Sequence, residues 1–339
     1  MEIQTNIPLK DYSTMHLGGP ARFLTSVTSP EELAKAIQNA QANSLPFFVL
    51  GGGSNIIIED KGFNGLIILN KIPGFEVLKQ EDGKTYIKIG AGEVWDSVVA
   101  RTVEMGLSGI EALSSIPGTA GATPVQNVGA YGQEIADTLV ELEAYDTTKN
   151  AFVVLSADDC GFSYRNSIFK DPATRHHIIT SITLALSLNH PSPPFYESLQ
   201  TYLDAHNITY YTPSVIRDAV MAIRAEKLPD PSVYPNAGSF FRNPIIEMWQ
   251  YNELLKDYPD MPSYPVDDKH VKIPAGWLIE AVGMKGYSAH GLKTHDKNAL
   301  VIVNVSAQTY SDLEAFKEEI RGKVRDTFRI SLVQEPEEL

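Results

Sequence analysis

The clearest helical pattern in the chain covers residues 29–41, SPEELAKAIQNAQ. Leu33 and Ile37 recur at helical spacing and are expected to form the buried stripe of this helix. Ser29 precedes the pattern and Glu32 follows three residues later, which is typical of a capping box. We therefore predict a helix whose first turn is fixed by its own side chains.

The same periodicity predicts four further helices. Two of them begin at a small polar cap, Thr212 or Ser311, and one is closed by Gly106. The expected helices cover residues 94–106, 212–228, 275–283 and 311–328, the last with a capping box between Ser311 and Glu314.

Runs of β-branched and aromatic residues between these helices predict strands. A short apolar run at 46–50 leads into the loop GGGSN and then into a second apolar run, IIIED. Because helices and strands alternate irregularly, we expect an α+β fold. The other expected strands are 21–27, 86–92, 139–148, 151–156, 176–188, 299–306 and 329–334.

The composition is that of an ordinary globular protein, and the net charge bears on which kinds of partner the protein can bind. Hydrophobic residues make up 43% and charged residues 21% of the 339 residues, a length that allows two or three domains. The formal net charge of −14 argues against a nucleic-acid partner, because non-specific binding needs a basic surface. A local cluster of lysines and arginines could still hold an anionic small ligand.

The chain carries no signal for export or membrane insertion. No apolar run is long enough to cross a bilayer, and the first residues lack the basic-then-apolar layout of a signal peptide. Cys160 is the only cysteine, which excludes an internal disulfide and suits a reducing compartment. We expect a cytoplasmic protein, and a monomer, because nothing indicates an obligate interface.

Two glycine-rich loops are candidates for a cofactor site. In GGGSN, residues 51–55 lead into a strand rather than a helix, which disfavours both the Rossmann fold and the P-loop. A phosphate held here would be held by loop amides. The second loop, 114–132, interleaves glycines with polar residues, which suits either a flat cofactor or a tight structural crossover.

Three other stretches could carry chemistry. Arg165 in FSYRNSIFK is a cation among apolar neighbours, where it could pair with a structural carboxylate or with a substrate carboxylate. Ser239 in NAGSFFRNP could be a turn hydroxyl, and no G-x-S-x-G elbow marks it as a hydrolase nucleophile. The terminal EPEEL has the composition of a solvated acidic tail.

No metal site is expected. His176 and His177 are adjacent on an expected strand, so their side chains should point to opposite faces. His290 and His295 lack a nearby cysteine or a paired carboxylate pattern, and no zinc-ligand spacing occurs.

Eight motifs together form a specific, ordered set: STMHLGGPA, LGGGSNIII, IPGTAGATPVQNVGAYG, YRNSIFK, KLPDP, AGSFFRNP, AGWLIE and EPE. On these motifs the chain resembles the UDP-N-acetylenolpyruvoylglucosamine reductase (MurB) family, flavoenzymes of peptidoglycan precursor synthesis and hence of cell-wall biogenesis, cell shape and cell division. The resemblance implies a two-lobed FAD-binding domain of the vanillyl-alcohol-oxidase (PCMH) type and a C-terminal α+β substrate-binding domain. FYES places Tyr196 where one family subtype has a tyrosine that closes over the substrate.

The resemblance also implies a division of the chain. The FAD-binding unit would span about 17–189. The expected parts are a first FAD-binding lobe at 1–70, a second lobe at 71–211 with the tyrosine loop near 191–200, a substrate-binding domain at 212–327, and a C-terminal strand and tail at 328–339.

The family reduces an enolpyruvyl ether to a D-lactyl ether in two half-reactions, with non-covalent FAD as cofactor and NADPH as co-substrate. The resemblance implies that a UDP-sugar receives hydride at C3 and a proton at C2. Arg165 would bind its carboxylate, Glu337 would polarise that carboxylate, and Ser239 would donate the proton. Since Glu337 is close to the end of the chain, Glu335 is the alternative if the expected strand 329–334 frays.

The remaining site residues follow from the same resemblance. Lys227 of KLPDP is the lysine that we expect to assist proton donation by Ser239. The expected cofactor contacts are Gly51, Gly52, Gly53, Ser54, Asn55, Ser115, Ile116, Pro117, Gly118, Thr119, Gly121, Ala122, Gln126, Asn127, Gly129, Ala130 and Tyr131. The expected substrate contacts are Tyr164, Tyr196, Lys227, Asn243, Tyr264, Lys285 and Asn298.

Two other functions stay open on the sequence alone. Alcohol and sugar oxidases share this flavin fold and often attach the flavin covalently through His or Cys, whereas the two candidate loops contain neither residue. A non-catalytic sugar-nucleotide-binding protein would bind the ligand without consuming NADPH.

Overall fold

The computed structural model describes residues 2–171 and 174–339. The chain forms two compact units. The first unit contains the chain up to Ile7 together with Ala21–Gly52 and Asn64–Glu226, and the second contains Pro8–Pro20, Gly53–Phe63 and Lys227–Leu339. The loop GGGSN is therefore divided, with its first two glycines in the first unit and its last three residues in the second.

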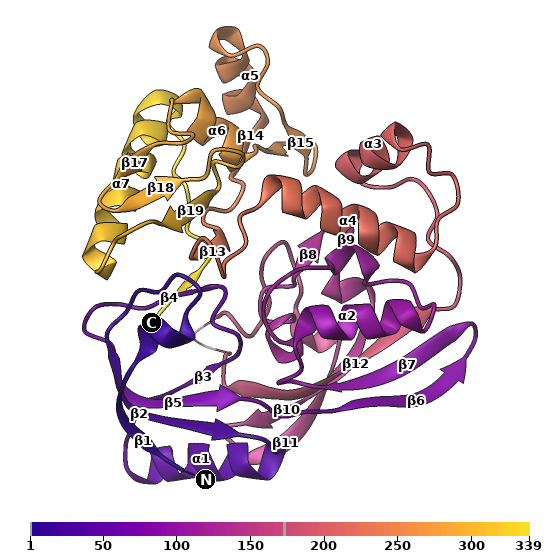
Figure 1. Cartoon of the computed structure of the whole chain (residues 1–339), viewed down its shortest axis with the longest axis vertical. Helices are drawn as coiled ribbons and strands as arrows, with labels where there is room; N and C mark the ends of the chain where they lie inside the picture. Colours follow the sequence, from indigo (N-terminus) through magenta and orange to yellow (C-terminus); the bar gives the residue numbers. More distant parts are fainter. Residues whose placement is uncertain (1, 172–173) are drawn as a thin grey trace. The chain divides into compact units, whose positions relative to one another are not determined.

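The first unit begins with a four-stranded sheet in the order β1-β2-β5-β3, in which β3 and β5 are parallel. Helix α1 lies along this sheet (Figure 1), with Leu33 and Ile37 buried against Leu66 and Ile68. These elements are β1 (Gln4–Pro8), β2 (Pro20–Val27), α1 (Pro30–Ala42), β3 (Phe47–Leu50) and β5 (Phe63–Asn70).

The start of α1 confirms the predicted cap and corrects the predicted box. The Ser29 hydroxyl accepts a hydrogen bond from the Glu32 amide at 3.2 Å. The Glu32 carboxylate, however, accepts from the Thr28 amide and hydroxyl at 2.7 and 2.9 Å. The carboxylate thus reaches one residue further back than a capping box requires.

The second sheet of the first unit is antiparallel throughout, in the order β11-β10-β12-β7-β6. Helix α2 covers one face, because Trp95 and Val98 pack against Ile89 and Ile182 of the sheet. These elements are β6 (Phe75–Glu81), β7 (Lys84–Gly90), α2 (Trp95–Glu104), β10 (Leu139–Asp146), β11 (Ala151–Ser156) and β12 (His177–Ser187).

Helices α3 (Glu197–Ala205) and α4 (Pro213–Lys227) complete the first unit. They pack on each other through Leu199 and Leu203 of α3 and Ile216 and Val220 of α4. The expected start of a separate region at 212 therefore differs from the structure, in which the first unit extends to Glu226. The apolar face of α4 is the reason, because it is buried within the first unit.

The second unit is built on a sheet in the order β13-β19-β18-β17, with a smaller sheet in the order β14-β16-β15. Its core includes Phe240, Phe241, Leu278 and Phe316. The elements are β13 (Asn236–Ser239), β14 (Ile245–Glu247), α5 (Met248–Asp257), β15 (Tyr264–Pro265), β16 (His270–Lys272), α6 (Ala275–Ala281), β17 (Ser288–Ala289), β18 (Leu292–Thr294), β19 (Val301–Asn304) and α7 (Tyr310–Phe328).

The predicted capping box of α7 was two residues late. Thr309 is the N-cap, and its hydroxyl accepts from the Asp312 amide at 3.1 Å while the Asp312 carboxylate accepts from the Thr309 amide at 3.0 Å. Ser311 instead bonds through its amide and hydroxyl to the Asp60 carboxylate, each at 3.2 Å. Ser311, which the local pattern predicts as the cap, is thus hydrogen-bonded to Asp60, a residue distant in sequence.

The expected last strand, 329–334, was also wrong. Ile330 and Leu332 are buried in the core, and only Gln334 forms a bridge, with Phe241. The chain becomes a strand three residues later, where β20 (Glu337–Glu338) pairs in parallel with β4 (Ile56–Ile57). The apolar residues of this segment are explained by packing and not by pairing.

A two-stranded hairpin in the first unit joins β8 (Gly129–Ala130) to β9 (Gln133–Glu134). Within residues 2–171 and 174–339, no helix combines the length and the apolar character needed to cross a membrane.

Candidate functional site

The glycine loops of the first unit touch each other through their backbones. A Cβ atom added to Gly52 would lie 2.8 Å from the Gly118 Cα atom, and one added to Gly51 would lie 2.7 Å from the Thr119 hydroxyl oxygen. These separations are too short for a side chain. Residues predicted to contact a cofactor are thus brought together from two loops, and their contact with FAD stays a prediction.

Substitution of Gly52 by alanine tests this contact. Because the new methyl group meets backbone, the loops must move apart, and we expect the free energy of unfolding to fall by about 1–3 kcal/mol. We also expect the affinity for FAD to fall about tenfold, which corresponds to about 1.4 kcal/mol. Thermal unfolding and FAD titration of the apoprotein measure the two effects.

Gly322→Ala is the matched control, because Gly322 lies inside α7 and an added Cβ atom comes no closer than 4.0 Å to the Arg325 guanidinium. This change should stabilise the helix by up to about 1 kcal/mol and leave FAD affinity unaltered. If Gly52→Ala, like Gly322→Ala, lowers neither the free energy of unfolding nor the affinity for FAD, close contact between the loops is not required for FAD binding.

The loop 114–132 contains several residues in the left-handed backbone region. Ser115, Asn127 and Tyr131 have φ values of 57°, 46° and 49°, and Gly118 has 124°. Such positive-φ turns let the backbone come close to a bound cofactor. The other predicted cofactor residues of this loop are Ile116, Pro117, Gly121, Ala122, Gln126, Gly129 and Ala130.

A salt bridge that the sequence reasoning missed fixes the beginning of this loop. The Ser115 amide donates to Asp96 Oδ1 at 2.6 Å, and Arg217 donates to both oxygens of the same carboxylate at 2.6 and 2.9 Å. The Arg217 hydrogen bond holds the pKa of Asp96 below its usual value. The carboxylate therefore stays charged and keeps Ser115 in its left-handed conformation.

A second missed arginine lies two helical turns further along α4. Arg224 Nη2 donates to the Ser115 carbonyl at 3.1 Å, and its guanidinium hydrogen-bonds the Tyr131 hydroxyl. Burial lowers the pKa of Arg224 and raises that of Tyr131. The signal in the sequence was the seven-residue spacing of Arg217 and Arg224, which puts two charges on one half-buried face of α4.

Tyr131 and Gly132 form the turn of the β8–β9 hairpin, with φ values of 49° and 85°. Two left-handed residues between paired strands are typical of a type I′ turn. Tyr196 packs on this turn, with its ring edge-on to Tyr131 at a centroid distance of 6.2 Å. The predicted tyrosine-loop residue thus contacts a predicted cofactor residue.

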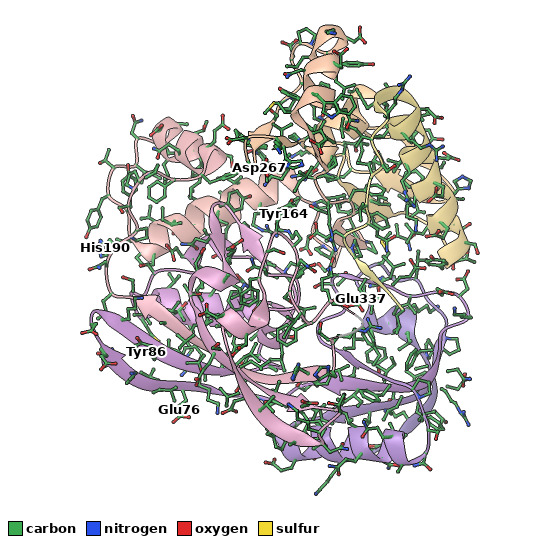
Figure 2. The ribbon with its side chains drawn as sticks, turned by 180° about the vertical axis from the view of Figure 1, so that it is seen from behind. Glu76, Tyr86, Tyr164, His190, Asp267 and Glu337 are labelled. Carbon is green, nitrogen blue, oxygen red and sulfur yellow. The ribbon has the colours of Figure 1, made fainter. Side chains whose placement is uncertain are left out.

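Arg165 lies in a tight turn that projects it toward the same hairpin. The turn is closed by reciprocal bonds of 3.1 Å between the backbones of Ser163 and Asn166, and Arg165 adopts a φ of 53°. Its Nη2 donates to the Gly129 carbonyl at 2.7 Å. Tyr164, labelled in Figure 2, has its ring 5.3 Å from the guanidinium carbon. The predicted pairing of Arg165 with a substrate carboxylate stays a prediction.

In the second unit, the pairing of β13 shifts register immediately before Ser239. Asn236 and Ser239 pair with Val303 and Val301, and the register shifts between them. Gly238 has a φ of 73°, and a Cβ atom added to it would meet nothing within 4 Å. Bulges of this kind re-aim side chains beside active sites. Open space therefore adjoins the strand at Gly238, the residue before Ser239.

Thr14 connects strand β13, which contains Ser239, to Gly53 in the middle of the GGGSN loop. The Thr14 hydroxyl donates to the Asn236 carbonyl at 2.6 Å, and its amide donates to the Gly53 carbonyl at 3.1 Å. A Cβ atom added to Gly53 would lie 1.9 Å from the Tyr12 carbonyl oxygen. Residues from the start, the first glycine loop and the C-terminal third of the chain therefore meet in one unit.

The end of the chain is fastened on both sides of Glu337. The Glu335 amide donates to the Phe240 carbonyl at 2.9 Å, and the Glu337 amide donates to the Asn55 carbonyl at 3.0 Å. The Tyr310 hydroxyl holds Glu338, so the alternation of β20 turns Glu337, labelled in Figure 2, the other way. The terminal position of Glu337 is thus no obstacle to a fixed geometry, although the expected strand does not provide it.

Lys317 of α7 is a further residue that the sequence reasoning missed. Its side chain is buried, with an exposed fraction of 6%, and its ammonium ion-pairs with Glu314. It also donates to Gln334 Oε1 at 3.0 Å, and Gln334 Nε2 donates to the Pro336 carbonyl at 2.9 Å. Lys317 therefore holds the residue before Glu337 in place.

Lys317→Met should loosen this tail. The variant leaves Gln334 without its donor, so we expect unfolding free energy to fall by about 1–3 kcal/mol. If the tail positions Glu337, turnover of the substrate should fall while reduction of the cofactor is unaffected. Lys323→Met, on the same helix at an exposed position, controls for loss of a lysine. Equal loss in both half-reactions would show that Lys317 is only structural.

Of the predicted substrate residues in the second unit, some are exposed and others already hold neighbouring groups. Tyr264 is 40% exposed on β15, and Lys227 is exposed at the end of α4. Asn243 accepts from the Ala275 amide at the start of α6, and Asn298 accepts from the Leu300 amide. The Lys285 ammonium lies 3.0 Å from both oxygens of the neighbouring Glu280. An anionic ligand would have to compete with that carboxylate for Lys285.

The predicted separation of His176 and His177 on opposite faces was wrong. Their ring centroids are 4.1 Å apart, and both lie beside Asp146. The reason is that β12 begins at His177, so His176 still belongs to the preceding turn and does not follow strand alternation.

Comparison with known proteins adds independent findings. Residues 21–151 match the FAD binding domain family, and residues 230–339 match the family described as UDP-N-acetylenolpyruvoylglucosamine reductase, C-terminal domain. A UDP-N-acetylenolpyruvoylglucosamine reductase of Ralstonia nicotianae is 39% identical over 337 residues, covering 98% of this chain and 98% of that protein.

Solved structures agree with these matches. The UDP-N-acetylenolpyruvylglucosamine reductase of Thermus caldophilus aligns with a TM-score of 0.67 and 26% identity, covering 100% of this chain and 99% of that one. The 6-hydroxy-D-nicotine oxidase of Arthrobacter nicotinovorans aligns with a TM-score of 0.51 and 14% identity, covering 97% and 86%. The latter likeness shows the fold alone, an α+β flavoprotein fold of the expected type.

Proposed function

The chain belongs to the UDP-N-acetylenolpyruvoylglucosamine reductase family, and on that premise we propose how its own residues perform the reaction. It is an FAD-containing, NADPH-dependent oxidoreductase that reduces UDP-N-acetylglucosamine enolpyruvate to UDP-N-acetylmuramate for peptidoglycan synthesis. The enolpyruvyl double bond gains a hydride at C3 and a proton at C2. The chain must therefore bind a cofactor, stabilise the charge that develops at C2 and supply the proton.

FAD, when bound, supplies the hydride chemistry that links NADPH to the substrate. The residues that would hold it are those of the two glycine loops, and the loop contact at Gly52 and the left-handed residues from Ser115 to Tyr131 fit a cofactor approached by backbone. Asp96, Arg217 and Arg224 would act as positioning residues for that loop. Because the loops contain no His or Cys, we propose that the FAD is released by denaturation.

Arg165 is proposed to bind the carboxylate of the enolpyruvyl group. As C3 receives hydride, negative charge builds at C2 and spreads into the carboxylate, where a planar guanidinium can hold it with two parallel hydrogen bonds. The bond from Arg165 to the Gly129 carbonyl supports this role, because it fixes the guanidinium beside a predicted cofactor residue. Tyr164 would line the same position from the neighbouring residue of the turn.

Ser239 is proposed to donate the proton to C2. The bulge at Gly238 and the open space on that side support it, since the hydroxyl is presented at the end of β13. A serine hydroxyl is a weak acid, so a cation or relay must stabilise the alkoxide that it leaves. Lys227 is our proposal for that role, although within the described residues no hydrogen bond joins Lys227 to Ser239.

Glu337 is proposed to polarise the carboxylate from the tail. To assist, it must be protonated or hydrogen-bonded, because a bare anion would oppose the developing charge. Its backbone bond to Asn55 supports the role by fixing its position. Glu335 stays the alternative, since its backbone is equally fixed to Phe240.

The UDP-sugar would be held by a separate set of residues. Lysine side chains offer point charges to a diphosphate, and amide and phenol groups orient the sugar. This set comprises Lys227, Asn243, Tyr264, Lys285 and Asn298, and we propose Tyr196 as a residue that closes over the substrate. A monomer in the cytoplasm stays our expectation.

The observation that carries the proposal is full-length identity of 39% to a reductase of this name, together with the Ser239 bulge and the fastened tail in one unit. The test supplies FAD, NADPH and the enolpyruvyl sugar nucleotide without oxygen, and identifies the product by mass spectrometry. Gain of one hydride and one proton, yielding the lactyl ether, is expected. Consumption of oxygen with an alcohol, and FAD that stays on denatured protein, would instead identify an oxidase.

A further inference from the structure

A cluster at one end of the five-stranded sheet contains no residue to which we assign a catalytic, cofactor-binding or substrate-binding role. Asp146 is the last residue of β10 and lies directly opposite His177, the first residue of β12. His176 precedes it in the turn, and the Thr147 amide donates to the His176 carbonyl at 2.9 Å. The backbone register therefore fixes one carboxylate and two imidazoles next to one another.

The two oxygens of Asp146 have different surroundings. Oδ1 accepts from the Thr148 amide and hydroxyl at 2.9 and 2.7 Å and from the Lys149 amide at 3.1 Å. Oδ2 is buried and accepts no hydrogen bond among the described residues, and Asp146 as a whole has an exposed fraction of 0%. One oxygen thus builds the β10–β11 turn, while the other is aimed into the cluster.

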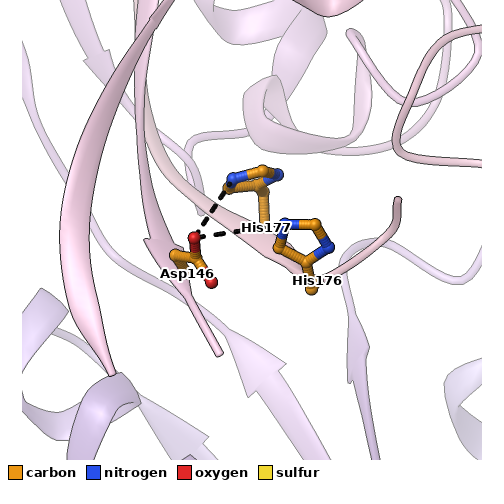
Figure 3. A group of neighbouring side chains, drawn as sticks. All are labelled: Asp146, His176 and His177. Atoms are coloured by element: carbon orange, nitrogen blue, oxygen red, sulfur yellow. Dashed lines mark ion pairs between the residues drawn. The ribbon is translucent and has the colours of Figure 1, made fainter. Parts of the chain in front are cut away.

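Both histidines face that oxygen. His177 Nε2 lies 3.6 Å and His176 Nε2 lies 4.0 Å from Asp146 Oδ2, and both interactions converge on the same oxygen in Figure 3. These distances exceed those of hydrogen bonds. Ligand atoms bound to one tetrahedral metal ion by bonds of about 2.1 Å lie about 3.4 Å apart, and two ligands of any one ion lie at most about 4.2 Å apart. The separations of 3.6 and 4.0 Å fall between these two values, so small side-chain movements would bring the atoms around one ion.

We infer that Asp146, His176 and His177 form a binding site for a divalent transition-metal ion such as Zn²⁺, which would fasten the end of β10 to the start of β12. Two imidazoles and one carboxylate favour this class of ion over Mg²⁺ or Ca²⁺, which prefer oxygen ligands. Three protein ligands leave a fourth position for water.

The positive charge of Lys149 would repel a bound metal ion, so its removal distinguishes a metal site from an ordinary ion pair. Its ammonium lies 3.3 Å from Asp146 Oδ2 and is 70% exposed, so it competes for the oxygen but can move into water. If the cluster is a metal site, removing Lys149 strengthens binding. If the cluster is only a charge-balanced turn, removing Lys149 merely loses an ion pair.

The experiment uses the full chain loaded with FAD, equilibrium dialysis against Zn²⁺ and elemental analysis of the bound metal. We expect one Zn²⁺ that Asp146→Asn binds at least about 100-fold more weakly, since loss of an outer-shell partner alone costs 10- to 100-fold. Lys149→Ala should bind it about tenfold more tightly, because a like charge near the ion is removed. Excess Mg²⁺ should not displace it.

Asp146→Asn keeps the Oδ1 acceptor that builds the turn, and retention of FAD checks its folding. His176→Ala, at a ring that is 31% exposed, gives a second test if Asp146→Asn does not fold. His270→Gln is the matched control, because His270 lies 2.9 Å from Asp267 and 3.3 Å from Glu247 without a second histidine. Equal Zn²⁺ binding by the wild type and the ligand variants, weaker binding by Lys149→Ala, or displacement by Mg²⁺ would overturn the proposal.

Discussion

Ser239→Ala is expected to leave reduction of FAD by NADPH within about twofold of the wild-type rate and to slow reoxidation by the enolpyruvyl substrate by about 100- to 10,000-fold, the range that a positioned proton donor contributes. The hydride step from NADPH requires no proton at C2, so only the second half-reaction involves the hydroxyl. Rapid-mixing absorbance measurements without oxygen record the two half-reactions separately.

The control for this variant lies in the same sheet. Ser288 is exposed on β17, so Ser288→Ala removes a hydroxyl from that sheet without touching β13. It should leave both half-reactions at the wild-type rate. Equal slowing of both half-reactions in Ser239→Ala would mean that the variant disturbs the site in general, and the proton-donor role would be lost.

Arg165→Lys is expected to slow reoxidation by about 100- to 1,000-fold, the loss seen when one preorganised donor to a developing anion is removed. Lysine keeps the charge but lacks the planar fork that matches a carboxylate. It also cannot reproduce both the bond to the Gly129 carbonyl and a two-point contact with the substrate. Reduction by NADPH should change far less, because no carboxylate takes up charge in that step.

Two checks separate substrate binding from effects on the cofactor. FAD affinity is measured first, because Arg165 contacts the β8–β9 hairpin, and the rates are then taken with FAD saturating. Arg22→Lys, at an exposed position of β2, is the matched control and should be silent. Wild-type reoxidation by Arg165→Lys would show that the guanidinium does not bind the carboxylate.

Local patterns predicted the parts of the fold that local forces determine. The first helix was recognised because Ser29, Leu33 and Ile37 lie within one short segment, and all three behave as predicted. The start of α7 was misplaced because Asp60, distant in sequence, takes Ser311. A capping pattern cannot reveal such a competitor.

The candidate site shows the same division. Its glycine loops and its ordered motifs were visible in the sequence, and they carried the family resemblance that the comparisons confirm. The residues that fix those loops could not be seen in the sequence. Asp96 and Arg217 are far apart along the chain, and they meet only after α4 packs within the first unit. Lys317 was missed for the same reason, since its partner Gln334 lies beyond the end of its helix.

The most direct test of the proposed reaction follows one sample through both half-reactions without oxygen. Protein loaded with FAD is mixed with one equivalent of NADPH, and the absorbance of oxidised flavin is followed before and after addition of the enolpyruvyl sugar nucleotide. We predict that NADPH removes the absorbance and that the substrate restores it with stoichiometric formation of the lactyl ether. Flavin that stays reduced after substrate is added would contradict the assignment.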